Sequence, residues 1–461
     1  MGLIVFVILA GLEIVLAVWT CTKGKEKRER RKNVLIVHTL QIVVVILAML
    51  LPLGQKWRFV PVLLFLAILL VTSGVIMLVK RNREDGVGKP AGAIASCIFC
   101  VLFLALFLLP AFIFTGYKGL PVSGEYRIGE ASAILIDKSR KDPFEQDGSF
   151  REVPVHFYYP ESGKSDAEQF PLVLFSHGAF GYYQSNTSTY RELAGNGYVV
   201  AALDHPHHAC FTKDTDGRMV IVDQAFLREA GEQTREDGMD DHAQERLGIY
   251  QEWMSLRTAD MGFVLDELER AGNDAVMDES WFVRSRDRDL ISGILKKTDL
   301  SRIGLMGHSM GGATSVALGR TRNDVNAVID LDGTMLSEYT GVAGGRFTVN
   351  ENPYEIPVLE FVNWETYNEL AEHMEEYRAE GGRYPNDELM RHATAGYTTT
   401  IRDTRHMDFT DLPLLSPVLG NLLGSGERDK EEVMTLVNSL VLQFFNCFLK
   451  GEGVFTVRNI Y

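Results

Sequence analysis

Residues 307–311, with the sequence Gly-His-Ser-Met-Gly, constrain the fold more than any other stretch of this chain. They follow an apolar run at 302–306, which predicts a short buried strand. They precede a small-residue segment at 312–318, which predicts a helix. A Gly-x-Ser-x-Gly sequence between a strand and a helix is typical of a tight turn that exposes the serine above a sheet. Ser309 is therefore the candidate nucleophile, with a helix N-terminus beneath it.

Apolar strand-like runs alternate with helical segments throughout the part of the chain after residue 120. This alternation predicts an α/β fold with a mostly parallel sheet covered on both faces. The strand candidates are residues 153–159, 171–176, 198–204, 302–306, 327–331, 358–363 and 398–402, and the helix candidates are residues 188–196, 242–270 and 430–448. Residues 211–300 separate two of these strands by an unusual distance and include a charged run at 278–288. We expect them to form a cap-like insertion near the site.

A serine nucleophile needs a base and an orienting acid, which follow it in the order acid, then histidine, in this kind of fold. Asp332 comes directly after the strand candidate 327–331, where a loop can reach a histidine, and is favoured as the acid. Asp330, two residues earlier and deeper in the strand, stays an alternative. His406 follows the last strand candidate and is the predicted base.

An oxyanion hole needs two backbone N–H groups, one of them from the residue after the nucleophile. Met310 supplies that one, and Ala179, in the Gly-containing loop after the strand 171–176, is the expected second donor. His177 in the same loop is interpreted as a brace rather than a catalytic group. An apolar substrate pocket near the site is expected from Phe180, Tyr182, Trp364 and Phe409.

The first 120 residues differ in kind from the rest of the chain. Four apolar stretches, at 1–20, 34–53, 59–79 and 92–115, are each long enough to cross a bilayer. The sequence thus predicts a four-helix transmembrane domain at 1–120 and a second domain at 121–461. Glu13, His38 and Gln41 interrupt the stretches and are expected to face neighbouring helices. Cys97 and Cys100 are spaced like a metal or redox motif, but small apolar packing is the favoured interpretation.

Charge predicts the orientation of these spans. Net charge is +9 over residues 1–120 and −24 over the remainder. The acidic part is a poor match for nucleic acid. Basic residues gather in two of the connecting segments, which the positive-inside rule places in the cytoplasm. The N-terminus and the domain after residue 120 are then extracytoplasmic. The basic residues are Lys23, Lys25, Lys27, Arg28, Arg30, Arg31 and Lys32 in one segment and Lys80, Arg81, Arg83 and Lys89 in the other.

The motifs around Ser309, Asp332 and His406, with the His177-Gly178 loop and residues 201–205, resemble the plasma-type platelet-activating-factor acetylhydrolases. The resemblance runs from about residue 122 to 450. It implies an α/β-hydrolase fold, no metal or other cofactor, and hydrolysis of short or oxidised acyl groups from phospholipids. It also implies a triad of Ser309, Asp332 and His406 with Ala179 and Met310 as oxyanion donors. Met310 and the four-span anchor are two departures from the plasma enzymes. Bacterial relatives of the dienelactone-hydrolase type share much of the same arrangement of motifs.

Three functions are therefore weighed. The favoured one is a membrane-anchored serine esterase with an ester or phospholipid substrate. The second is a hydrolase of the same fold that acts on soluble esters, thioesters or peptides, because one fold hosts many chemistries. The third is a non-catalytic membrane scaffold, against which the retained Ser309, Asp332 and His406 argue. Whether Cys210 and Cys447 pair is left open.

Overall fold

The computed structural model describes residues 1–22, 26–51, 56–81, 89–161, 168–233, 242–274, 277, 280–283 and 285–461. Its internal contacts divide the chain into two compact units. One unit contains residues 1–119 together with 412–422, and the other contains residues 120–411 together with 423–461. Segment 412–422 therefore groups with the N-terminal helices, although it lies far from them in sequence.

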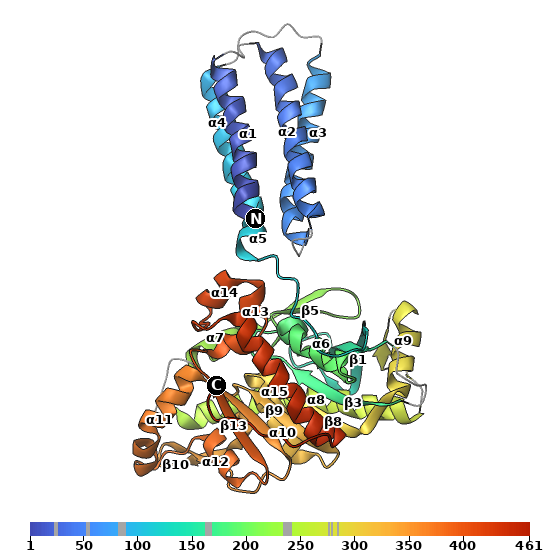
Figure 1. Cartoon of the computed structure of the whole chain (residues 1–461), viewed down its shortest axis with the longest axis vertical. Coiled ribbons are helices and arrows are strands. Elements are labelled where there is room, and N and C mark those ends of the chain that lie inside the picture. The colour runs from blue at the N-terminus through green and yellow to red at the C-terminus, as the bar shows by residue number, and fades with distance from the viewer. Residues whose placement is uncertain are drawn as a thin grey trace. The chain divides into compact units, whose positions relative to one another are not determined.

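Long apolar helices build the first unit (Figure 1). They are α1 Gly2–Thr22, α2 Lys27–Leu50, α3 Val60–Val79 and α4 Pro90–Phe107, with the shorter α5 Leu109–Ile113, α13 Leu412–Leu415 and α14 Pro417–Leu422. Leu9, Val45 and Leu104 are fully buried between the helices, while Val15 and Leu78 are 67% exposed. A soluble bundle carries polar residues on its outer face. These helices are apolar on both faces, which suits a lipid environment.

Five helices among the described residues are long and apolar enough to cross a membrane: α1, α2, α3 with the turn before it, α4 and α15 Lys430–Lys450. The last belongs to the second unit, where Val433, Val437 and Phe444 are fully buried in the core. The apolar face of α15 is thus buried against the sheet of the second unit.

The first basic segment is more helical than expected. Helix α2 begins at Lys27, so the basic residues 27–32 lie in its first turns and not in a loop. A run of Lys and Arg can be helical because these residues have good helix propensity. Lys23, Lys25 and Arg83 of the predicted connections lie outside the described residues.

A mostly parallel sheet of nine strands organises the second unit, in the order β13-β12-β9-β8-β3-β4-β2-β1-β7. The six strands from β13 to β4 are parallel, and β2, β1 and β7 continue the sheet in antiparallel pairs. The strands are β1 Ile128–Lys141, β2 Phe150–Pro160, β3 Phe170–Ser176, β4 Val199–Leu203, β7 Trp281–Phe282, β8 Thr298–His308, β9 Val325–Leu331, β12 Val358–Asn363 and β13 Gly396–Ile401.

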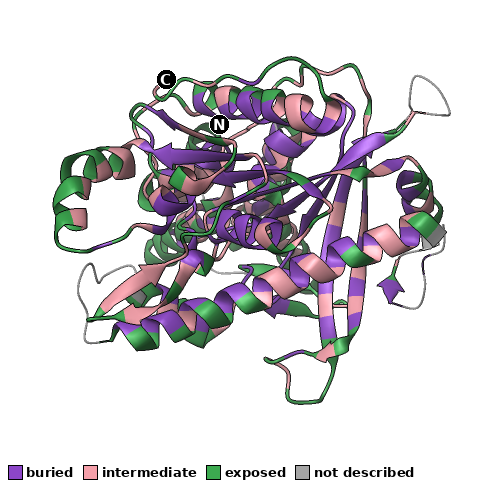
Figure 2. Ribbon diagram, turned by 90° about the horizontal axis from the view of Figure 1, so that it is seen from below, coloured by how far each residue is buried: buried purple, intermediate pink, exposed green. Residues whose placement is uncertain are grey.

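Helices cover both faces of this sheet. On β3, Leu172 and Leu174 face one apolar core with helices α8 Ala243–Asp274, α9 Ser285–Lys296, α10 Met310–Thr321 and α12 Pro385–His392. Val173 and Phe175 point the other way, toward α6 Thr187–Gly195 and α15. Because successive strand residues face opposite sides, a strand that is buried on both faces reads as a continuous apolar run. The inner strands β3, β4, β9 and β12 are accordingly buried along nearly all of their length, and the middle of the sheet is mostly buried in Figure 2.

The remaining elements lie outside the two core layers. They are helices α7 Gln224–Gln233 and α11 Trp364–Ala379, the short 3-10 helices η2 Tyr183–Asn186, η3 Leu336–Glu338 and η4 His406–Phe409, and two small hairpins. The hairpins are β5 Phe211–Lys213 with β6 Met219–Ile221 and β10 Tyr339–Ala343 with β11 Arg346–Val349.

The predicted mostly parallel α/β sheet is confirmed. Each strand candidate corresponds to an observed strand, and the three helix candidates correspond to α6, α8 and α15. The sequence reading missed β1, which alternates buried and more exposed residues and pairs with β2. The long interval at 211–300 contains two short strands of a hairpin, α7, α8, β7 and α9. Positions 278, 279 and 284 of the expected charged run lie outside the described residues.

The turn between β8 and α10 depends on two glycines. A Cβ on Gly307 would lie 2.2 Å from the carbonyl carbon of Gly311, and a Cβ on Gly311 would lie 2.0 Å from the carbonyl oxygen of Ser176. Since the obstructing atoms are backbone, neither neighbour can rotate away. The strand, the turn and the helix can approach this closely only with glycine at both positions.

We expect Gly311→Ala to destabilise the protein by about 1–3 kcal/mol or more, because the new methyl group overpacks a backbone contact. Gly248→Ala in α8 is the matched control, since a Cβ there meets no atom within 4 Å. The control should be neutral or stabilising by up to about 1 kcal/mol. Urea unfolding of the detergent-solubilised chain, followed by tryptophan fluorescence, measures both. Equal unfolding midpoints for the two variants would contradict the conclusion that the turn requires glycine at position 311.

Candidate active site

Ser309 occupies the turn between β8 and α10 in a strained conformation. Its φ is +55° and its ψ is −128°, values that a residue with a side chain rarely adopts. Its N–H donates to the carbonyl oxygen of Leu331 at the end of β9, 2.9 Å away. The residue is partly exposed, whereas both neighbours in the chain are buried. The strain thus presents one hydroxyl group to solvent from an otherwise closed turn.

Asp332 and His406 lie in direct contact. Oδ2 of Asp332 is 2.6 Å from Nδ1 of His406, and Asn363 donates to the same carboxylate from its backbone N–H and its side-chain amide. Burial raises the pKa of Asp332, but the hydrogen bonds from His406 and Asn363 outweigh it and hold that pKa below its ordinary value. The aspartate is therefore ionised at neutral pH and lies where it can accept a hydrogen bond from the imidazole.

Asp330, the alternative acid, has different surroundings. Its Oδ1 accepts a hydrogen bond from the N–H of Gly333, 2.9 Å away, and no contact joins it to His406 among the described residues. Burial, together with Glu360 and Asp332, raises the pKa of Asp330 well above its ordinary value. A neutral, fully buried carboxyl group cannot stabilise an imidazolium. The geometry therefore favours Asp332 over Asp330.

Ser309, Asp332 and His406 line one cavity of about 140 Å³. His406 keeps 43% of its side chain exposed. His308 holds the histidine loop, because its Nε2 donates to the carbonyl oxygen of His406, 3.0 Å away. Burial and the neighbouring His406 lower the pKa of His308 to about 3, so this brace is neutral at pH 7. The remaining lining residues are Gly333, Thr334, Phe361, Val362, Asn363, Thr366, Tyr384 and Asn386.

The loop after β3 approaches the serine from the other side. A Cβ on Gly178 would lie 3.1 Å from the Cβ of Ser309, so the loop that contains Ala179 runs directly beside the nucleophile candidate. His177 accepts from the N–H of His205 through Nε2 and contacts the carbonyl oxygen of Gly178 through Nδ1. Burial and nearby Arg257 hold the pKa of His177 well below its ordinary value. His177 is thus a neutral brace within this loop.

Arg257, on α8, also holds this loop, and nothing in the sequence pattern pointed to it. Its guanidinium donates to the carbonyl oxygens of His177 and Gly178 and is fully buried. One turn along the helix, Asp260 accepts from Arg151 of β2, at 2.8 Å and 3.1 Å. Helix α8 therefore supplies a charge, Arg257, that holds the loop beside Ser309.

The four aromatic pocket candidates lie in four different environments. Phe409 is fully buried in the core against Phe361. Trp364 stacks on Tyr367, and Tyr182 contacts Phe211 of the β5–β6 hairpin. Only Phe180 joins the apolar cluster that includes Met310. None of the four lines the 140 Å³ cavity.

The apolar cluster around Met310 comes mainly from the insertion. Phe226 of α7 and Trp253 and Met254 of α8 pack with Met310 and Ala313 at the start of α10. These residues are separated by 50 or more positions from Ser309, so no local motif could have assigned them to the site. The insertion therefore contributes apolar surface as well as the Arg257 brace.

A family model described as "Platelet-activating factor acetylhydrolase, isoform II" matches residues 151–453. The chain belongs to this family. Two curated relatives, both named platelet-activating factor acetylhydrolase, come from Cavia porcellus and Gallus gallus. They are 23% identical over 296 residues and 22% identical over 300 residues, which is 61% and 60% of this chain. The matched part spans 58% and 61% of their respective lengths.

A solved structure supports the fold independently. The ferulic acid esterase from Streptomyces cinnamoneus aligns with a TM-score of 0.51 and 22% identity, over 72% of this chain and 93% of its own. The match of the acetylhydrolase family model begins within β2 and ends just after α15. It contains Ser309, Asp332, His406 and the insertion, and it does not reach the N-terminal helices.

We expect Asp332→Asn to slow fluorophosphonate labelling of Ser309 by up to about 10⁴-fold, because asparagine stabilises the wrong tautomer of His406. Asp330→Asn is the matched control. It replaces a carboxyl that is already neutral, so labelling should change by less than about tenfold. Rates of labelling at pH 7, measured by gel fluorescence, give both values. A larger loss of labelling rate in Asp330→Asn than in Asp332→Asn would make Asp330 the acid.

Proposed function

We propose that this chain is a membrane-anchored serine esterase that cleaves carboxylic esters through Ser309, His406 and Asp332. One observation carries the proposal: the hydrogen bond between His406 and Asp332 lies in the same cavity that Ser309 lines. The strained turn at Ser309 and membership of the acetylhydrolase family support it further.

In the proposed reaction, Nε2 of His406 removes the proton from Ser309 as Oγ attacks the ester carbonyl carbon. Asp332 holds Nδ1–H of the ring and stabilises the imidazolium that forms. The N–H groups of Ala179 and Met310 donate to the oxyanion of the tetrahedral intermediate. The imidazolium then gives its proton to the departing alcohol. Water, activated by His406, next hydrolyses the acyl-enzyme and restores the serine.

The proposed substrates are esters with a short or oxidised acyl group, including the sn-2 ester of phospholipids. A cavity of about 140 Å³ is small beside the roughly 300–1,000 Å³ of drug-sized ligand pockets. It therefore suits an acyl group of a few carbons better than a long chain. Polar groups of Asn363, Thr366 and Asn386 line it, which favours a short or oxygen-bearing acyl group over an unmodified fatty chain. The names of the curated relatives are consistent with this class.

We expect turnover of p-nitrophenyl esters to fall step by step from acetyl to palmitoyl, since each methylene changes the free energy of binding by only about 1–3 kcal/mol. Phosphatidylcholine with an sn-2 acetyl group should be cleaved faster than its sn-2 palmitoyl analogue. Ser309→Ala is the control and should abolish both reactions. Cleavage limited to peptides, thioesters or long-chain lipids would contradict the substrate class. Full activity of Ser309→Ala would contradict the serine mechanism.

We further propose that α1 to α4 span the membrane and that the catalytic unit is extracytoplasmic. The four helices have 18-residue windows with a mean hydropathy of 2.4 or more, against 1.4 for α15. The basic residues at the start of α2 and the end of α3 would then face the cytoplasm. The tether, rather than surface charge, would keep an acidic catalytic unit close to lipid substrates.

Native Cys210 provides a test of this orientation, because it is an exposed free cysteine. A membrane-impermeant maleimide should label Cys210 on intact cells, and Cys210→Ser should lose that label. A cysteine introduced by Arg81→Cys, at an exposed position just beyond α3, should react only after the cells are permeabilised. Labelling of the Arg81→Cys variant on intact cells, with Cys210 protected, would invert the topology.

A further inference from the structure

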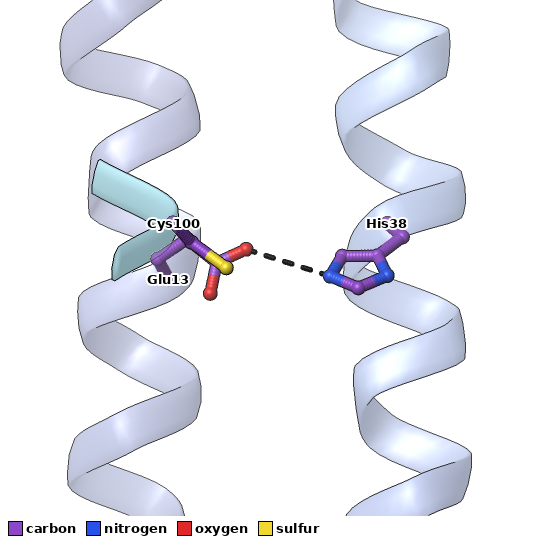
Figure 3. Close-up of side chains that lie close together, drawn as sticks. All are labelled: Glu13, His38 and Cys100. Atoms are coloured by element: carbon purple, nitrogen blue, oxygen red, sulfur yellow. Dashed lines mark ion pairs between the residues drawn. The ribbon is translucent and has the colours of Figure 1, made fainter. Parts of the chain in front are cut away.

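Three ionisable side chains meet inside the N-terminal helix bundle. Glu13 on α1, His38 on α2 and Cys100 on α4 present ligand atoms that all lie within 4.8 Å of one another (Figure 3). All three residues are at least 95% buried. Oε1 of Glu13 and Nε2 of His38 are 3.8 Å apart, which is too far for a hydrogen bond. These groups therefore approach one another without bonding directly.

The surrounding residues orient these groups as the outer shell of a metal site would. Nδ1 of His38 is 3.0 Å from Oγ of Ser73 on α3, which leaves Nε2 directed toward Glu13. Nε2 of Gln41 donates to Oε1 of Glu13, 3.0 Å away, and to the carbonyl oxygen of Leu9. In metal sites, a histidine ligand is usually held by a hydrogen bond through its other ring nitrogen, and carboxylate ligands also accept hydrogen bonds.

Gln41, whose amide nitrogen contacts Glu13, also carries an oxygen without a partner among the described residues. Its side chain is fully buried, and its Oε1 finds no hydrogen-bond partner in the part of the chain that the structure describes. An orphaned buried acceptor has a substantial free-energy cost. Because it belongs to the amide that contacts Glu13, this oxygen is a candidate further ligand for a cation bound there.

We propose that Glu13, His38 and Cys100 bind a single Zn²⁺ ion, with Gln41 Oε1 or a water molecule as the fourth ligand. Zn²⁺ accepts carboxylate oxygen, imidazole nitrogen and thiolate sulfur at about 2.0–2.3 Å in a tetrahedral site. Such bonds separate neighbouring ligand atoms by roughly 3.3–3.8 Å, so the observed cluster needs only a small contraction. Mg²⁺ and Ca²⁺ prefer sites made of oxygen ligands alone.

Charge balance supports this choice. Binding releases the thiol proton of Cys100, and the carboxyl proton of Glu13 if it carries one, to water, while His38 binds as the neutral ring. A dication with one thiolate and one carboxylate has zero net charge. A neutral group is the least costly one to bury among apolar helices, where an isolated ion has a cost of several kcal/mol or more. The site would join α1 and α4 to α2, and it requires nothing of Ser309.

Cobalt substitution tests the site on the purified full-length protein in detergent. After removal of metals with a chelator, one equivalent of Co²⁺ should produce a near-ultraviolet thiolate-to-cobalt band and visible bands, and Zn²⁺ should abolish them. Cys100→Ser should lose the thiolate band and weaken Zn²⁺ binding by at least 10- to 100-fold. Cys97→Ser, a change of the same kind on the same helix, should leave both unchanged. An unchanged thiolate band in the Cys100→Ser variant, or no cobalt binding by the wild type, would overturn the proposal.

A second measurement needs no substitution and so does not depend on the folding of variants. Zn²⁺ should slow alkylation of Cys100 by N-ethylmaleimide at least tenfold, read by peptide mass spectrometry, while Cys97 in the same peptide region serves as the internal reference. Equal alkylation rates with and without Zn²⁺ would mean that the cluster is polar packing only. Fluorophosphonate labelling of Ser309 in the same samples reports the folded state of the catalytic unit and should not respond to Zn²⁺.

Discussion

The candidate site depends on one close contact between backbones, at the point where the β8–α10 turn meets the end of β3. Gly311 lies so near the carbonyl group of Ser176 that a single methyl group would not fit. The contact fixes the strained turn that carries Ser309. It also fixes the residue from which the loop 177–181 departs. The same contact thus anchors both the turn that carries the nucleophile candidate and the start of the loop that carries the expected oxyanion donor Ala179.

A buried charge on α8 holds the first residues of that loop. Arg257 and Asp260 lie about one turn apart on α8, so both project from the same side of the helix. Arg257 binds the loop carbonyl groups, and Asp260 binds Arg151. Burying such charges is costly unless nearly every donor and acceptor is bonded. Here the hydrogen bonds of Arg257 and Asp260 offset that cost and join α8 to β2 and to the loop after β3.

Sequence patterns over a few residues predicted the features that depend on residues close together in the chain. The turn at Ser309, the strands buried on both faces and the order of Asp332 and His406 were all readable from short segments. Arg257 was not, because its partners His177 and Gly178 lie about 80 residues away and only the fold brings them together. β1 was missed for a different reason: its apolar run is short, at residues 133–136, and small, polar and charged residues flank it on both sides. The aromatic pocket candidates failed to gather at one cavity because closeness in sequence does not fix the direction of a side chain.

Hydrogen-bond geometry alone does not identify an active site in this fold. Ser176, His205 and Asp260 form a second serine–histidine–aspartate chain, with Oγ to Nε2 at 2.9 Å and Nδ1 to Oδ2 at 3.1 Å. All three are fully buried, and burial with the nearby Arg257 lowers the pKa of His205 to about 4. This imidazole is a poor base at neutral pH and cannot meet a substrate. His406 differs in access, since it lines a cavity and keeps 43% of its side chain exposed. Access to the histidine, rather than the hydrogen-bonded pattern itself, distinguishes the candidate site from this buried chain.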